Sequence, residues 1–298
     1  MRIAVTGSTG LVGSALVEAL VAAGHTVSRV MRDQRKLGAG DVFWNPDTAY
    51  VDTVQLDGSD AIVHLAGETI SERWTPAQKE MIHGSRLRGT QLIAEAARAM
   101  FRPPQVLVSA SATGWYGDRG DEVLREDSKP GKGYLADVCR DWETATEVAS
   151  RAGIRVVHVR TGIVLSAKGG ALKKMLPPFR MGLGGKIGSG RQYMSWIALD
   201  DTVGAILHAI NTASLKGAVN VVAPAPVTNL QFTKALGKVL GRPTIAPLPA
   251  FVVKMVFGEM GEELLLGSQR VEPTQLLATG FSFRYPEIEG ALRRALVA

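Results

Sequence analysis

Up to about residue 160, short apolar runs alternate with segments whose apolar positions recur at helical spacing. The run at residues 2–5 and the periodic segment at residues 11–23 are the first such pair. We predict strands at residues 2–5, 26–31, 41–44, 61–65, 105–109 and 155–159. Helices are predicted at residues 11–23, at 76–100 with an interruption near Gly84, and at 134–151. This alternation indicates an α/β fold with a Rossmann-type, doubly wound parallel sheet.

The regular alternation fades after Gly162. We therefore assign residues 1–165 to a Rossmann domain, with further segments returning to it around residues 190–225, and residues 166–298 to a smaller α/β C-terminal substrate lobe. The glycine-dense stretch 182–190 predicts a mobile or ligand-facing loop. Further helices are expected at residues 200–211, with Asp200 as a candidate N-cap, and at 230–240.

A glycine turn stands between the first strand and the first helix, at residues 6–13 (TGSTGLVG). Gly7 would allow a tight exit from the strand, Gly10 would let the backbone approach a diphosphate, and Gly13 would let the helix pack closely on the sheet. Unpaired amides and the positive helix end would face the anion. The alternative is a plain structural turn. The predicted cofactor-binding residues of this turn are Gly7, Ser8, Thr9, Gly10, Leu11, Val12 and Gly13.

The residue after the second strand discriminates between the two nicotinamide cofactors. A carboxylate there accepts the ribose hydroxyls of NAD, whereas a cation favours the 2′-phosphate of NADP. The strand ends at Arg32, so we predict NADP rather than NAD. Asp33 would reverse this preference if the strand ended one residue later. The basic residues here could also form only a solvated loop face.

Composition is typical of a globular enzyme-sized protein, because 46% of the 298 residues are hydrophobic. The net charge of +6 contains no long basic run, so neither nucleic acid nor membrane binding is expected. The single Cys139 cannot form an internal disulfide, and the sequence shows neither a signal-peptide pattern nor a membrane-length apolar run. We therefore expect a cytoplasmic protein. The five histidines are scattered, and no metal site is predicted.

Three motifs resemble the extended short-chain dehydrogenase/reductase family, also called the NAD-dependent epimerase/dehydratase family. They are the turn at residues 6–13, HLAGE at residues 64–68 and SASATGWYG at residues 109–117. Residues 188–197 (GSGRQYMSWI) and motifs at residues 240–243, 257–260, 264–271 and 280–286 resemble a narrower, atypical subgroup. That subgroup carries a short C-terminal domain of unknown function, and its members are usually named only as epimerase family proteins. The tail at about residues 240–290 would be this domain.

The resemblance implies a proton-relay tyrosine with a lysine four residues later, but this pair is missing. A tyrosine near its ordinary pKa of about 10 needs a nearby cation to act as a base at neutral pH. If Tyr134 is the tyrosine, Val138 stands at the lysine position. If Trp142 and Glu143 set the register instead, the two positions hold Leu135 and Cys139. Both registers lack the cation.

The resemblance also implies a serine or threonine that orients the substrate. Ser111 fits this position best and Thr113 second, although local backbone capping would also explain them. We name Ser111 and Tyr134 as candidate catalytic residues, while a packing role for Tyr134 stays open. Tyr116 and Lys132 are alternative proton sources. Cys139 is expected to be a small buried hydrophobe rather than a nucleophile.

Further cofactor contacts follow from the same resemblance. Glu68 would lie beside the adenosine ribose and Arg86 would also contact the cofactor, although each could be a surface ion-pair member. Thr161 would line the nicotinamide end, or simply mark the exit from a strand. The implied set is Leu65, Ala66, Gly67, Glu68, Arg86, Ser109 and Thr161.

Two classes of function remain open at this point. The first is an NADP-dependent reductase or epimerase-like enzyme that acts on an unknown small molecule; the glycine-rich loop favours it and it is our preferred hypothesis. The second is a non-catalytic NADP(H)-binding redox sensor or regulatory protein, which the missing tyrosine–lysine pair favours. The protein is expected to be a monomer or a homodimer.

Overall fold

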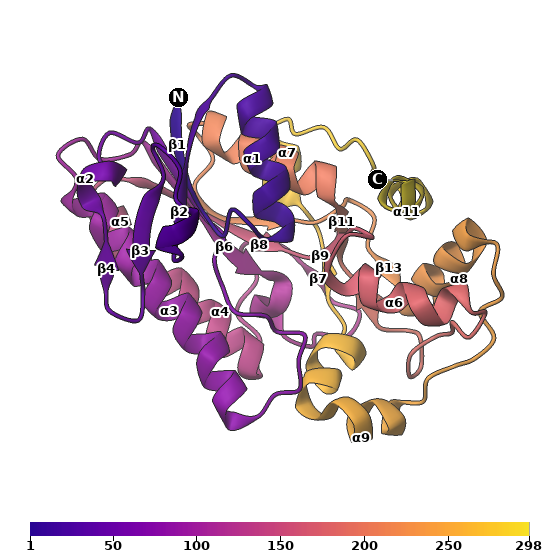
Figure 1. Ribbon diagram of the computed structural model, residues 1–298. Helices are drawn as coiled ribbons and strands as arrows, with labels where there is room; N and C mark the ends of the chain where they lie inside the picture. The colour runs from indigo at the N-terminus through magenta and orange to yellow at the C-terminus, as the bar shows by residue number, and fades with distance from the viewer. Residues whose placement is uncertain (298) are drawn as a thin grey trace.

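The protein is built around an eight-stranded sheet in the order β12-β8-β6-β5-β1-β2-β3-β4 (Figure 1). The computed structural model describes residues 1–297. Every neighbouring pair is parallel except β3 with β4. The predicted α/β fold with a parallel, Rossmann-type sheet is therefore confirmed. The strands are β1 Arg2–Thr6, β2 Thr26–Met31, β3 Val42–Asn45, β4 Tyr50–Val51, β5 Ala61–His64, β6 Val106–Ala112, β8 Arg155–Thr161 and β12 Gly217–Val221.

The strand order reverses beside β1, and this reversal positions the site. From β1 the chain passes to β2 and β3 on one side, and later to β5, β6 and β8 on the other. Thr6 at the end of β1 pairs in register with His64 at the end of β5. Ligands of open parallel sheets bind in the crevice outside the carboxyl ends of such strands, so the turns after Thr6 and His64 should form its floor.

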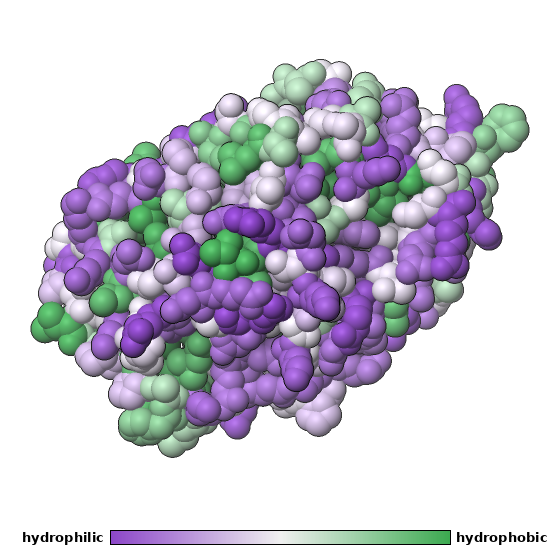
Figure 2. All heavy atoms as spheres, turned by 180° about the vertical axis from the view of Figure 1, so that it is seen from behind, coloured by the Kyte–Doolittle hydropathy of each residue, from purple (hydrophilic) through white to green (hydrophobic). Residues whose placement is uncertain are grey.

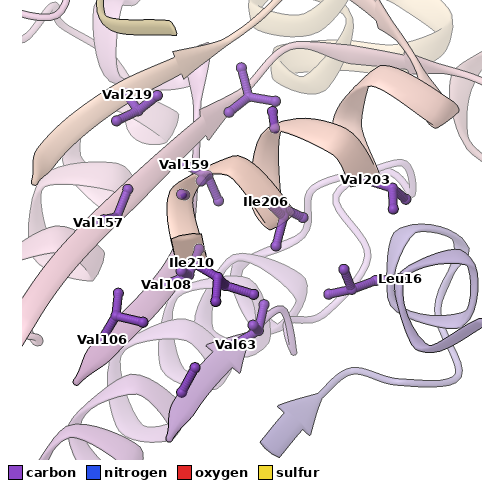
Figure 3. Close-up of a cluster of buried hydrophobic side chains, with 14 of the residues drawn as sticks. Leu16, Val63, Val106, Val108, Val157, Val159, Val203, Ile206, Ile210 and Val219 are labelled. Carbon is purple, nitrogen blue, oxygen red and sulfur yellow. The ribbon is translucent and has the colours of Figure 1, made fainter. Parts of the chain in front are cut away.

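Helices cover both faces of the sheet. On one face lie α1 (Leu11–Ala22) and α7 (Leu199–Asn211), and on the other α3 (Pro76–Ala99), α5 (Glu147–Arg151) and the short α2 (Thr53–Leu56). Figure 3 shows Ile206 and Ile210 of α7 beside the valines of the central strands, and Val203 near Leu16 of α1. Burying each such side chain contributes roughly 1.5–3 kcal/mol. This packing holds the sheet rigid, and so fixes the positions of the turns at its edge.

The C-terminal half contributes a second hydrophobic core. Trp196 is fully buried there among side chains of α6, α8 and α11, and its indole N–H donates to the Ala225 carbonyl at 3.1 Å. In Figure 1, α8 lies at the opposite end of the molecule from the β3–β4 edge. The helices are α6 Gly170–Arg180, α8 Asn229–Leu240, α9 Ala250–Gly261, α10 Thr274–Ala278 and α11 Ile288–Val297, with a π-turn at Glu262–Leu266. The short strands are β7 Val123–Leu124, β9 Ile163–Leu165, β10 Tyr193–Met194, β11 Trp196–Ala198, β13 Val227–Thr228 and β14 Arg270–Val271.

Three predicted elements differ from the structure by more than a shift of one or two residues at an end. Helix α3 runs without a break through Gly84, because one buried glycine costs a long helix only about 1 kcal/mol. The helix predicted at residues 134–151 is two helices, α4 (Tyr134–Thr144) and α5. Between them the Thr146 hydroxyl donates to the Glu143 carbonyl at 2.8 Å and also contacts His158. This side chain therefore competes with the helical hydrogen bonds of the backbone, and the helix is interrupted here. Strand β6 continues three residues beyond the predicted end at Ser109.

The structure bears on two interpretations of the C-terminal half. The glycine-dense stretch 182–190 packs on residues 246–248, and a Cβ at Gly185 would lie 2.0 Å from the Ala246 carbonyl oxygen. Its glycines therefore allow close approach of two backbone segments, and a ligand-facing role for the stretch stays a prediction. Asp200 does not cap α7, because Ala198 precedes the helix and Asp200 lies in its first turn. Its carboxylate pairs with Arg294 at 2.7 Å instead.

The surface shown in Figure 2 is mixed, with hydrophobic residues in separate patches among hydrophilic ones. Within residues 1–297, no helix combines the length and the apolar character that crossing a membrane requires.

Candidate cofactor-binding site

The turn after β1 has room only for glycine at two positions. Gly7 has φ of +65°, and a Cβ there would lie 2.8 Å from the Leu65 carbonyl carbon. A Cβ on Gly13 would lie 2.1 Å from the Gly7 carbonyl oxygen. The Gly10 N–H donates to that same oxygen at 3.0 Å, which closes the turn. The two turns at the sheet edge are thus packed backbone against backbone, with α1 drawn close.

Thr6 and His64 lock these two turns together. The Thr6 hydroxyl accepts the N–H groups of Leu65 at 3.0 Å and Ala66 at 3.2 Å. Its own proton is then donated to Nδ1 of His64 at 2.8 Å. Burial lowers the pKa of His64 to about 4, so the ring is neutral near pH 7. A neutral imidazole with an unprotonated Nδ1 is the form that this hydrogen bond requires.

The start of α1 has the properties of an anion site. Its N-cap, Gly10, provides no side-chain hydrogen bond, so the first helical N–H groups lack a capping partner. The buried Ser8 hydroxyl also has no hydrogen-bond partner among residues 1–297. Amides at a helix N-terminus together with a spare hydroxyl are suited to a phosphate. The residues of this turn therefore fit the diphosphate of a dinucleotide.

Arg32 borders a depression next to this turn. The depression is lined by Arg32, Trp44, Pro46, Ala66, Gly67, Glu68 and Ser85. Arg32 is exposed and has no ion-pair partner in the part of the chain that the structure describes. This places the predicted Arg32, Ala66, Gly67 and Glu68 around one hollow, with an available guanidinium at its rim.

The neighbouring charges are already paired. Arg29 forms an ion pair with Asp41, and Arg35 and Lys36 both pair with Asp33. Asp33 also accepts the backbone N–H of Arg35 at 3.2 Å, and the Arg35 side chain lowers the pKa of its carboxyl group. Asp33, the residue that would have reversed the cofactor preference, thus has its carboxylate bound within its own loop.

Ser111, a candidate catalytic residue, is buried and already hydrogen-bonded. Its hydroxyl donates to Oε1 of Glu143 on α4 at 2.7 Å. Arg160 at the end of β8 donates to both oxygens of the same carboxylate at 2.8 Å. The structure therefore gives Ser111 a structural partner, and a substrate-facing role for it stays a prediction.

Tyr134, the other candidate catalytic residue, directs its hydroxyl toward α3. The hydroxyl donates to the Lys79 carbonyl at 2.5 Å, and Lys79 Nζ lies 4.4 Å from the centre of the ring. Burial raises the pKa of Tyr134 to about 12. Such a group is protonated at neutral pH and its proton is already shared, which supports the packing alternative.

The alternative proton sources, Tyr116 and Lys132, are no better suited than Tyr134 to transfer a proton. Tyr116 is fully buried, donates to Asn220 and accepts from Arg160, and burial raises its pKa to about 12. Lys132 is exposed. Cys139 is buried as expected, and burial raises the pKa of its thiol to about 12, so it is a poor nucleophile.

The remaining predicted contacts are spread along the crevice. Thr161 ends β8 and lies in register with Ala112 at the end of β6. Ser109 is fully buried three residues before the end of β6, and its hydroxyl contacts the Ala110 carbonyl at 3.4 Å. The Glu68 N–H donates to the Ser85 hydroxyl at 3.0 Å. Glu68 and Arg86 form no ion pair within 4 Å among residues 1–297. Burial lowers the pKa of Arg86, but the Glu68 carboxylate is near enough to oppose part of this shift, so both alternatives for these residues stay predictions.

Sequence reasoning missed one contact made by the C-terminal tail. Glu263 accepts the N–H groups of Tyr134 at 2.8 Å and Leu135 at 3.0 Å, and so caps the first turn of α4. Gly133, which precedes the helix, offers no side chain for this purpose. The tail therefore stabilises the start of the helix that carries the family's tyrosine and lysine positions.

Comparison with known proteins agrees with this geometry. Residues 3–222 match the NAD dependent epimerase/dehydratase family. The chain belongs to this family. Residues 248–295 match a domain of unknown function, DUF1731. Both the family and the C-terminal domain predicted from the sequence are therefore confirmed.

Relatives in this family match along nearly the whole chain. An epimerase family protein of Mycobacterium bovis, Mb2239, is 45% identical over 291 residues, covering 97% of this chain and 96% of that protein. Human epimerase family protein SDR39U1 is 39% identical over 297 residues, covering 98% and 99%. The homologous protein of Arabidopsis thaliana is named as chloroplastic, so the cytoplasmic location stays a prediction.

Solved structures match as well. The crystal structure of human SDR39U1 isoform 2 with NADPH has 38% identity and a TM-score of 0.90, covering 99% of this chain and 98% of that one. UDP-glucose 4-epimerase of Thermus thermophilus with NAD has a TM-score of 0.74 at 20% identity, over 98% and 97% of the chains, which shows the shared fold. This chain thus has the fold of nucleotide-binding epimerases.

Proposed function

We propose that the protein is an NADP(H)-dependent oxidoreductase or epimerase-like enzyme that acts on a small molecule. The observation that carries the cofactor assignment is the unpaired Arg32 at the rim of the hollow beside the glycine turn. A guanidinium binds a phosphate in two-pronged fashion, and the competing Asp33 is held by Arg35 and Lys36. The human relative with 38% identity was crystallised with NADPH, which supports the same choice.

The chain's own residues supply binding and orientation. The amides at the start of α1 and the Ser8 hydroxyl would hold the diphosphate, and Arg32 would hold the 2′-phosphate. When bound, NADP(H) supplies hydride chemistry. The side chains that would deliver a proton in this family are absent or bonded elsewhere, because Leu135 and Cys139 occupy one register and the Tyr134 hydroxyl donates to Lys79. The proton of the reaction would then come from water or from a hydroxyl of the bound molecules.

A second candidate function is NADP(H) binding without turnover, as in a redox sensor. Two specific observations favour it: the Ser111 hydroxyl is bonded to Glu143, and that of Tyr134 to the Lys79 carbonyl. Both candidates need the same cofactor site.

The cofactor assignment is tested with a matched pair of variants. Arg32→Ala should weaken NADPH binding by about 10- to 100-fold, the usual effect of losing hydrogen bonds to a charged group, and leave NADH binding unchanged. Arg35→Ala is the control, because Arg35 already pairs with Asp33 and should not discriminate between the cofactors. Equal effects of the two substitutions on NADPH would refute the role of Arg32.

Turnover is tested separately from binding. The protein is incubated with NADPH that carries deuterium at nicotinamide C4 and a panel of aldehydes and ketones, and separately with NADP⁺ and a panel of nucleotide sugars. Deuterium in a product alcohol, or conversion of a nucleotide sugar into its epimer, would establish the enzyme. Retention of all the label in NADPH together with unchanged nucleotide sugars, with tight cofactor binding intact, would favour the sensor.

A further inference from the structure

Two neighbouring segments of the C-terminal half expose large hydrophobic side chains. Residues 181–188, after α6, run beside residues 243–250, after α8, and the Leu248 N–H donates to the Lys186 carbonyl at 2.9 Å. The second segment leads into α9, which lies at the lower edge of the molecule in Figure 1 and at the lower left in Figure 2, where hydrophobic residues reach the surface. The exposed fractions are 67% for Met181, 61% for Leu183, 82% for Ile245, 70% for Phe251 and 69% for Met255. Several large apolar side chains exposed in one region indicate an interaction site.

The same region is basic. Neither residues 148–199 nor residues 202–258 contain an aspartate or a glutamate. Arg180 ends α6 beside Met181, and Arg242 follows α8. Both arginines are exposed, and neither forms an ion pair within residues 1–297. We call the five hydrophobic residues together with Arg180 and Arg242 the tip surface.

The folded chain gathers positive charge that the sequence spreads out. Further basic residues on α6, α8 and the segments after them also lack a carboxylate partner in the part of the chain that the structure describes: Lys173, Lys186, Arg191 and Lys234. No long run of lysine or arginine marks them in the sequence, because they come from separate elements. A partner of the tip surface must therefore supply negative charge.

This charge disfavours two possible occupants. A second copy of the chain in a two-fold contact would bring one positive patch against another. An anionic lipid layer binds helices whose polar face carries many lysines and arginines. Helix α9 has only Lys254, which pairs with Glu262 at 3.0 Å, and Glu259 is exposed on the same helix. Lipid headgroups would therefore meet carboxylates beside the apolar residues.

The side chains of the tip surface are those of a protein interface. Aromatic residues, methionine and arginine are enriched at such interfaces, whereas lysine is depleted. We propose that the tip surface binds an acidic segment of a partner protein. Its carboxylates pair with Arg180 and Arg242, and its apolar side chains cover Ile245 and Phe251. This interaction does not involve the cofactor site, so it stands or falls independently of the proposed function.

A displayed peptide library tests which chemistry the tip surface recognises. Random peptides on phage are selected on the folded full-length protein, and the enriched peptides are synthesised and titrated by calorimetry. The test variants are Ile245→Ser and Arg242→Glu. Phe101→Ser and Arg98→Glu are the matched controls, because Phe101 is 93% exposed and Arg98 is exposed without an ion pair within residues 1–297, both at the end of α3.

The enriched peptides should carry a net negative charge and large apolar side chains. Ile245→Ser and Arg242→Glu should each weaken their binding by at least about 10-fold, and the two controls should stay within about twofold of the unmodified protein. Added salt should weaken binding to the unmodified protein, because the charges are exposed to solvent. All four substitutions are at the surface, so the midpoints of urea unfolding should be unchanged.

Several results would overturn the proposal. They are a selection without enrichment, enriched peptides without an excess of acidic residues, and binding that survives both test substitutions. Phosphatidylglycerol vesicles and single-stranded oligothymidine are titrated in parallel, and tighter binding of either, lost in Arg242→Glu, would assign the surface to lipid or nucleic acid instead. If a test variant does not fold, Ile245→Ala or Arg242→Gln replaces it, and unchanged peptide binding by that replacement would equally contradict the proposal.

Discussion

Arg160 and Glu143 form a buried two-pronged ion pair, with Nε and Nη2 of the arginine each 2.8 Å from one carboxylate oxygen. Their side chains are only 4% and 9% exposed. The pair joins the end of β8 to α4, and Trp115 stacks on the guanidinium at 4.0 Å. It fixes α4 against the end of β8, and its carboxylate accepts the Ser111 hydroxyl.

Breaking this ion pair should destabilise the folded protein. Glu143→Gln removes the charge that compensates Arg160, so the free energy of unfolding should fall by about 3–5 kcal/mol. Glu147→Gln is the control, because Glu147 pairs with Arg151 at the surface and should matter by less than about 1 kcal/mol. Urea unfolding followed by circular dichroism measures both. A loss below about 1 kcal/mol for Glu143→Gln would mean that the pair is not structural.

His64 should make the protein sensitive to acid. Burial lowers its pKa to about 4, whereas an unfolded histidine titrates near 6.5. Between these values the unfolded chain binds more protons than the folded one, so this part of the stability is present above pH 6.5 and is lost as the pH falls toward 4. The loss from His64 between pH 7 and pH 5 should be about 2 kcal/mol.

Comparing the unmodified protein with a variant that lacks His64 isolates the contribution of this residue to the free energy of unfolding. His64→Gln removes the titrating group, so its free energy of unfolding should fall by about 2 kcal/mol less than that of the unmodified protein over the same pH range. His83→Gln is the control, because its ring is partly exposed beside Asp141, and it should keep the full acid loss. Parallel pH profiles for the unmodified protein and His64→Gln would contradict the buried neutral ring.

Gly10 offers a test of the diphosphate site that leaves the fold intact. Its φ of −78° and ψ of 174° are accessible to any residue, and a Cβ there comes no closer than 3.3 Å to the Gly7 carbonyl oxygen. Gly10→Val should therefore fold, while its side chain occupies the approach to the amides of α1. Binding of NADPH and NADH should both be abolished. Gly290→Ala in α11, where a Cβ meets open space, should bind both normally. Binding of either cofactor by Gly10→Val would show that the turn is not part of the cofactor site.

The positions of the glycine turn and of Arg32 could be predicted from the sequence because local spacing determines them. Gly7, Gly10 and Gly13 lie between a strand and a helix, and Arg32 follows the next strand, as predicted, while their contacts with a cofactor stay predictions. Arg86 was predicted only from the family resemblance. Its contact with the Trp142 ring depends on the packing of α3 on α4.

Other features had no local signal. Glu263 caps the N–H groups of Tyr134 and Leu135, which lie 129 and 128 positions away along the chain. Nothing in the sequence of either segment indicates this contact. Ser111 resembles a substrate-binding serine in sequence, and only the approach of Glu143 from α4 shows that its hydroxyl is already bonded. The glycines of the stretch 182–190 predict a mobile or ligand-facing loop, but glycine also permits close backbone packing, and the contact with Ala246 is set by the tertiary fold.

We propose that this chain binds NADP(H) through the turn at residues 6–13 and distinguishes it from NAD(H) at Arg32. Calorimetric titration of the unmodified protein with NADPH and, separately, with NADH tests this most directly. We expect NADPH to bind about 10- to 100-fold more tightly. Equal affinities would contradict the role of Arg32, and no heat with either nucleotide would contradict the site itself.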